Sequence, residues 1–114
     1  TNSKVDLTST GETTVYTSPA DSTSTTATTS IIKSILLSED SGNADSITLT
    51  ITDTSSNVFS LFKTKAISSN TTTELLTQPL VMEASEALKV QASDANELHV
   101  VASILEIEPR EVTT

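Results

Sequence analysis

The chain contains no cysteine and no tryptophan, and it has only two glycines and three other aromatic residues. Without cysteine it has neither a disulfide framework nor thiol chemistry. Two glycines cannot build a glycine-rich loop that cradles phosphate. Because aromatic side chains are so scarce, a core must be built mainly from isoleucine, leucine and valine, and a carbohydrate-binding platform of several aromatic rings is disfavoured.

Basic charge is also scarce. Six lysines and arginines, scattered along the chain, stand against fifteen acidic residues, and the net charge is -9. Binding to nucleic acid requires clustered basic side chains, and so does binding to an anionic membrane surface. The sequence contains no run of about 18 apolar residues, the length that a helix needs to span a bilayer. We therefore expect no nucleic-acid partner and no membrane partner.

What the sequence does contain is short stretches in which apolar and polar residues alternate, the pattern of half-buried β-strands. Turn-forming residues separate these stretches at short intervals, which is typical of a sandwich or barrel. The length of 114 residues fits one domain. We predict an all-β, single-domain antiparallel β-sandwich, jelly-roll or Ig-like, of about seven strands. The predicted strands are 13–17, 31–38, 46–54, 58–67, 75–83, 86–93 and 98–108.

The remaining residues define the domain limits. Residues 1–12 are polar and predict an N-terminal arm, residues 13–108 form the sandwich domain, and residues 109–114 form a C-terminal tail. The segment 31–38 is apolar on both phases of the alternation, so we expect it to be covered on both faces. A helix over MEASEALKVQ is the alternative to strand 86–93, but its apolar residues fall at strand spacing.

Few residues offer chemistry. The segment EDSGNAD, 39–45, has a faint likeness to a calcium loop through Glu39, Asp40, Asn43 and Asp45, but the bidentate acid that would close such a site is missing from it. His99 is the only histidine and has no local partner that would make it a general base. We predict no catalytic residue, no cofactor and no metal ligand, and therefore no enzyme.

The order of four segments carries a family resemblance. These are TTVYTSPA, then ATTSIIKSILLSED, then ITLTITD, then QPLVMEASEALKVQASDANELHVVASILEI, which together lie within residues 13–107. The chain resembles small virion proteins of tailed bacteriophages, many of them marine, which open with T-x-[VI]-Y-T-x-P-A and close with an L-[KR]-V-Q-A-S-like segment. One departure is the turn Ser85-Glu86, where the family tends to have Gly-Asp. Since serine tolerates positive φ poorly, we expect a different turn there.

The resemblance implies a non-enzymatic virion structural protein, assembled in the host cytoplasm and decorating or cementing the capsid. A neck, tail or baseplate component is the alternative, and an adhesion or carbohydrate-binding module that recognises a host surface is a rival from another class. The implied partners are other virion proteins, such as the major capsid protein or tail and neck proteins, and copies of the chain itself.

The last predicted strand suggests where a partner would bind. One phase carries Leu98, Val100, Ala102 and Ile104, while the opposite phase carries Val101, Leu105 and Ile107. Only one phase can face the core of a sandwich. We expect the second to be covered by another chain, or by an arm of the same subunit. Val5 and Leu7, the apolar residues of the predicted arm, are the other interface candidates.

Overall fold

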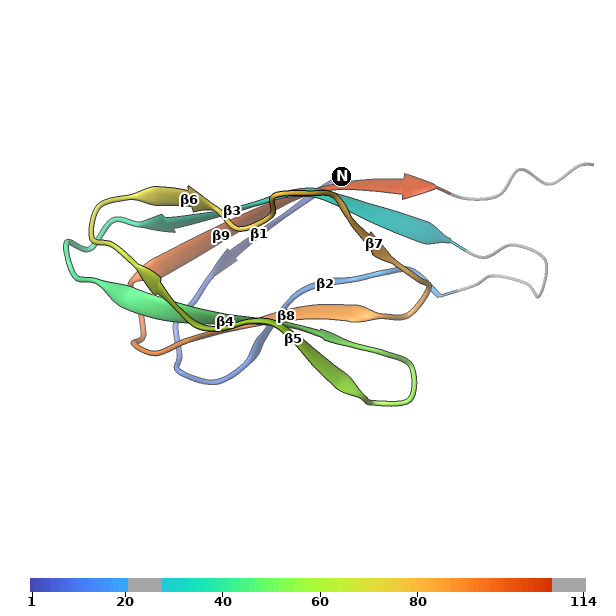
Figure 1. The fold of residues 1–114 in the computed structure, drawn as a ribbon, viewed down its shortest axis with the longest axis horizontal. Helices are drawn as coiled ribbons and strands as arrows, with labels where there is room; N and C mark the ends of the chain where they lie inside the picture. Colours follow the sequence, from blue (N-terminus) through green and yellow to red (C-terminus); the bar gives the residue numbers. More distant parts are fainter. Residues whose placement is uncertain (21–27, 108–114) are drawn as a thin grey trace, which may run out of the picture.

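The computed structural model describes residues 1–20 and 28–107. It is an all-β sandwich of two antiparallel sheets (Figure 1). The predicted tail 109–114 lies outside the described residues. The nine strands of the described part are β1 (Asn2–Asp6), β2 (Thr13–Thr17), β3 (Thr29–Glu39), β4 (Asp45–Thr52), β5 (Val58–Ile67), β6 (Thr72–Glu74), β7 (Leu80–Met82), β8 (Ala87–Ala92) and β9 (Leu98–Ile107).

The larger sheet has the strand order β1-β9-β3-β6, with β7 also paired to β3, and the smaller sheet has the order β2-β8-β4-β5. In Figure 1 the two sheets form the upper and lower layers, and β7 descends at one side between them. The described part of the chain contains no helix that is long and apolar enough to cross a membrane. The MEASEALKVQ segment supplies strand β8, so the helix alternative does not apply.

The core between the sheets is aliphatic, as the scarcity of aromatic residues predicts. Ile47 and Leu49 of β4 are fully buried, and so are Leu88 of β8 and Val100 of β9. Each faces inward because side chains of a strand alternate between its two faces. Every strand that contributes an inward apolar residue thus helps to hold the two layers together.

Strand β3 owes its mixed apolar pattern to a bulge and not to cover on both faces. The register with β9 shifts between Ile32 and Ser34, so that Lys33 is the extra residue. A bulge of this kind brings residues of opposite phase to the same face, and both Ile32 and Ile35 are fully buried. The expectation that both faces are covered is wrong, because Leu36 on the outer face is 41% exposed.

The predicted N-terminal arm, residues 1–12, is in large part a strand of the sandwich. Residues of β1 pair antiparallel with β9, from Asn2 opposite Ser103 to Asp6 opposite His99. The next residue, Leu7, is 1% exposed and belongs to the core. The arm interpretation failed because it weighed apolar content alone, whereas the backbone of β1 is stabilised by ladder hydrogen bonds to a neighbouring strand.

The predicted strand 75–83 is also wrong in its extent. Only the short strand β7 lies within it, beginning at Leu80, while β6 ends at Glu74, before the predicted start. Pro79 lies between them, and proline cannot donate a ladder hydrogen bond. At the turn before β8, Ser85 adopts φ 65°, a left-handed conformation that glycine adopts more readily than serine.

Candidate functional site

The outward face of the larger sheet carries a connected set of apolar side chains, which we call the outer apolar face. Its exposed members are Val81 (58%), Leu105 (47%), Ile107 (45%) and Leu36 (41%). Ile31 and Val101 are partly buried members of the same face.

Strand pairing places these residues side by side. Ile31 of β3 lies opposite Leu105 of β9 on one flank and opposite Val81 of β7 on the other. Leu36 lies opposite Val101 further along the same two strands. Directly opposed residues have Cβ atoms about 5 Å apart, so Val81, Ile31 and Leu105 form one apolar patch across three strands. The polar pair Ser34–Ser103 lies between this patch and the pair Leu36–Val101.

The five interface candidates fall into two groups. Leu105 and Ile107 are about half exposed and Val101 is partly buried, all on the outer apolar face. Val5 packs against the core, and Leu7 is buried within it. Leu7 is therefore inaccessible to a partner, and Val5 is largely so, because β1 turns this side of the strand inward.

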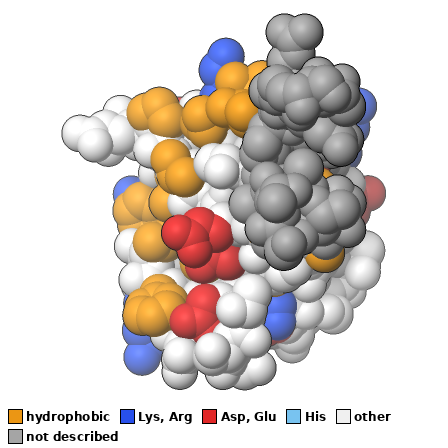
Figure 2. Space-filling model, turned by 90° about the vertical axis from the view of Figure 1, so that its right-hand side faces the viewer, with side chains coloured by type: hydrophobic (Ala, Val, Ile, Leu, Met, Phe, Trp, Pro, Cys, Tyr) orange, Lys and Arg blue, Asp and Glu red, His pale blue; other side chains and the backbone are white. Residues whose placement is uncertain are grey.

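A second exposed apolar region lies at the opposite sheet. Strand β5 is the outermost strand of the smaller sheet, and it exposes Val58 (58%), Phe59 (56%) and Leu61 (38%). A shallow hollow lies between Leu61 and Phe62 on one side and segment 75–80 on the other. Figure 2 looks onto one end of the sandwich and shows apolar side chains along the top and down one side of the view, with acidic side chains among them.

His99 links three strands at the outer surface of the larger sheet. Its Nδ1 contacts an Asp6 carboxylate oxygen from β1, and its Nε2 lies 3.2 Å from Asp40 Oδ1, just after β3. The hydrogen bond to Asp6 raises the pKa of His99, and the negative charge of Asp40 and Asp6 adds to the effect against the opposing influence of burial. Both ring nitrogens contact a carboxylate, so the imidazole connects β9 to β1 and to the residue that follows β3.

The four residues of the 39–45 segment do not converge on one site. Glu39 is 1% exposed, and its carboxylate accepts hydrogen bonds from the backbone of Ser41 and Gly42 at 2.9 Å each. Burial favours the neutral acid, but these bonds outweigh it and lower the pKa of Glu39. Asp40 turns to His99. Glu39 therefore fixes the backbone of its own turn.

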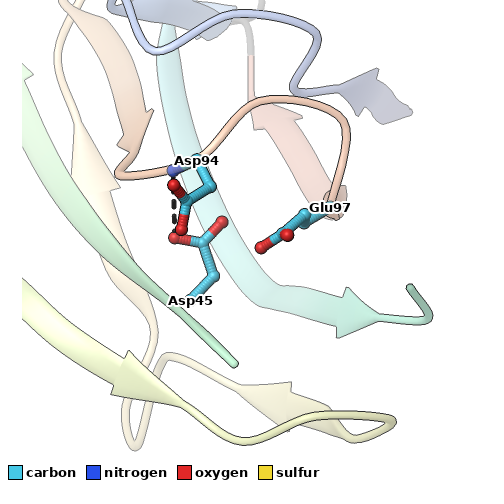
Figure 3. Close-up of side chains that lie close together, drawn as sticks. All are labelled: Asp45, Asp94 and Glu97. Atoms are coloured by element: carbon cyan, nitrogen blue, oxygen red, sulfur yellow. Dashed lines mark hydrogen bonds between the residues drawn. The ribbon is translucent and has the colours of Figure 1, made fainter. Parts of the chain in front are cut away.

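Asp45 faces a different segment of the chain. It opens β4, and its Oδ1 accepts hydrogen bonds from the backbone N–H groups of Ser46 (2.6 Å) and Asp94 (3.2 Å) and from the Ser93 hydroxyl. One carboxylate oxygen from each of Asp45, Asp94 and Glu97 lies within 4.8 Å of the others. Figure 3 shows how the three side chains lie. Burial raises the pKa of Glu97, and the charges of Asp94 and Asp45 raise it further.

Sequence reasoning missed this carboxylate cluster because it considered the 39–45 segment alone. The partners come from the turn SDANE, about fifty residues later. The signal that could have found them is strand pairing: Ile47 lies opposite Ala92, so an antiparallel register continued by two residues sets Asp45 opposite Asp94.

Comparison of the chain with protein-family models, with curated protein sequences and with solved structures finds no significant match.

Proposed function

We propose that this chain is a non-enzymatic structural protein of a tailed-phage virion, and that it decorates or cements the capsid through the outer apolar face. The observation that carries the proposal is this face itself, in which β3, β7 and β9 expose apolar side chains side by side. The sequence resemblance supplies the virion context.

An apolar sheet face in water favours association. Covering a fully exposed large aliphatic side chain contributes roughly 1.5–3 kcal/mol, and Leu105, Ile107 and Val81 are each about half exposed. Contiguous exposed apolar surface marks an interaction site more often than scattered residues do. A flat surface of this kind suits a subunit that is laid on a shell, where neighbours of fixed shape cover it.

The chain's charge supports a protein partner. A net charge of -9 repels phosphate backbones and anionic lipid, whereas a protein surface can present complementary basic groups around an apolar centre. The exposed apolar residues of β5 offer a second contact on the opposite sheet, which a neighbouring copy of the chain could use.

The test is the position and copy number of the chain on intact particles. Quantitative mass spectrometry of purified virions should find it in many copies, comparable to the major capsid protein, and labelled antibody should decorate the shell. A few copies at one vertex would instead assign it to the neck, tail or baseplate. Absence from purified virions, together with glycan binding by the isolated chain, would overturn the proposal in favour of a host-surface module.

A further inference from the structure

The carboxylates of Asp45, Asp94 and Glu97 have no part in the proposed association surface. Asp45 stands at the start of β4 in the smaller sheet, and Asp94 and Glu97 belong to the turn between β8 and β9. In Figure 3 the side chains of Asp45 and Glu97 extend toward one another, with Asp94 beside them. The group lies where the chain crosses from the smaller sheet to the larger sheet.

Two buried carboxylate oxygens in this group are unpaired. Asp45 is 7% exposed, and its Oδ2 is buried without a hydrogen-bond partner among the described residues. Glu97 Oε2 is also buried without a partner while both acids are ionised; a hydrogen bond between Glu97 and Asp45 is among the causes that raise the pKa of Glu97. A buried polar atom without a partner costs free energy, and like charges held close together add repulsion. A cation bound to both oxygens would remove both the cost of the missing hydrogen bonds and the repulsion.

We propose that Asp45, Asp94 and Glu97 bind one calcium ion. Calcium takes oxygen ligands at about 2.4 Å, so two ligands on opposite sides of the ion are about 4.8 Å apart. The three carboxylate oxygens lie within 4.8 Å of one another, and they span the space that such an ion fills. Water molecules complete the six to eight oxygen ligands that calcium takes.

The ion joins two segments of the chain that are distant in sequence. Asp45 is held in place by hydrogen bonds from Ser46, Ser93 and Asp94, so one ligand is fixed before the ion arrives. Glu97 directly precedes β9, and its attachment to the ion ties the start of β9, in the larger sheet, to β4 in the smaller sheet. The proposal departs from the expectation of no metal, which rested on the segment 39–45 alone.

Calcium should outcompete magnesium at this site. Magnesium requires octahedral geometry at about 2.0–2.1 Å and keeps most of its water, so it prefers one or two carboxylates. Asp94 is exposed, and three carboxylates from a partly open site place the dissociation constant at about 10⁻⁴–10⁻³ M, the range of extracellular calcium modules.

The experiment measures thermal unfolding and titration calorimetry of the full chain with calcium chloride. We expect one calcium per chain and a midpoint that rises by about 5 °C when free calcium is ten times the dissociation constant. Glu97→Gln should abolish the rise and the heat of binding. Its calcium-free midpoint should equal or exceed that of the wild type, because the substitution removes a repelled charge; loss of binding then cannot be attributed to misfolding.

Glu83→Gln is the matched control, since Glu83 is an exposed acid in the turn before β8, at the other end of that strand from Asp94. It should retain the full response. Sodium or magnesium chloride at matched ionic strength should give a smaller rise. Equal effects of all three salts, or a response that survives Glu97→Gln, would show general screening of a protein of charge -9 and overturn the proposal. If Glu97→Gln raises the midpoint while the wild type binds no calcium, Asp45 and Glu97 share a proton and the proposal is wrong.

Discussion

At the scale of single residues, His99 shows how a group without catalytic surroundings can hold a structure together. It lies at the outer side of the larger sheet, between the carboxylates of Asp6 and Asp40. The protonated imidazole donates from both nitrogens, whereas the neutral ring can donate from only one. Folding therefore favours the proton, which is why the pKa of His99 is raised.

This predicts a stability that depends on pH. Because the folded-state pKa is raised above the unfolded value of about 6.5, the contribution of His99 is fully present below about pH 6.5 and is lost as the pH rises through the folded-state pKa. At about pH 6, His99→Gln should lower the free energy of unfolding by about 0.5–1 kcal/mol, the scale of exposed ion pairs. At about pH 9 the difference should shrink toward zero.

Urea unfolding at both pH values measures the effect. A double-mutant cycle with Asp6→Asn isolates the pair, since residues in direct contact show non-additive effects. A cost of His99→Gln that is the same at both pH values would mean that the ring acts through packing and not through its charge.

At the scale of strands, the sequence predicted those whose alternation is regular and missed those that depend on a partner. Strands β2 and β5 have the predicted bounds of 13–17 and 58–67. The bulge in β3 depends on register with β9, and that pairing joins residues about seventy positions apart. The short strands β1 and β6 have little apolar content of their own and pair with β9 and β3. Strand β7 is entirely apolar and lies within the predicted strand 75–83, which was only too long. The carboxylate cluster was missed for the same reason, since only the pairing of β4 with β8 brings its members together.

Strand β1 gives a direct test of this view. Leu7→Ala should lower the free energy of unfolding by about 2–4 kcal/mol, because a fully buried leucine is replaced by a cavity. The neighbouring Thr8→Ala is the control, since Thr8 is exposed and its loss should change stability by less than about 0.5 kcal/mol. Hydrogen exchange of the monomer should show protected amides in β1. Rapid exchange there, with Leu7→Ala as harmless as Thr8→Ala, would restore the interpretation of a free arm.

At the scale of the whole molecule, the two sheets share one core, and the carboxylate cluster lies apart from the outer apolar face. Four acids, Glu39, Asp45, Asp94 and Glu97, gather near the turns that join β3 to β4 and β8 to β9, whereas the outer apolar face lies along β3, β7 and β9. Under the proposed function, this arrangement would orient the subunit with its apolar face toward the partner and the acidic turns away from it. Strand β9 contributes to both the core and the outer apolar face: its inward-facing residues belong to the core, and its outward-facing residues belong to the face.

The two phases of β9 should therefore respond differently to the same substitution. Replacing Val101 and Leu105 by serine changes the outward phase, and we expect a folded monomer that has lost about 1 kcal/mol or less, since Leu105 is half exposed and Val101 only partly buried. Incorporation into particles should fall sharply.

Replacing Val100 and Ile104 by serine is the matched control on the inward phase of the same strand at the same spacing. Both residues are buried, so this pair should cost several kcal/mol and leave little folded protein. Monomer melting and particle occupancy, measured side by side, decide the matter. An outward double variant that fails to fold belongs to the core, and one that folds and still enters particles at the wild-type level rules out this face as the contact.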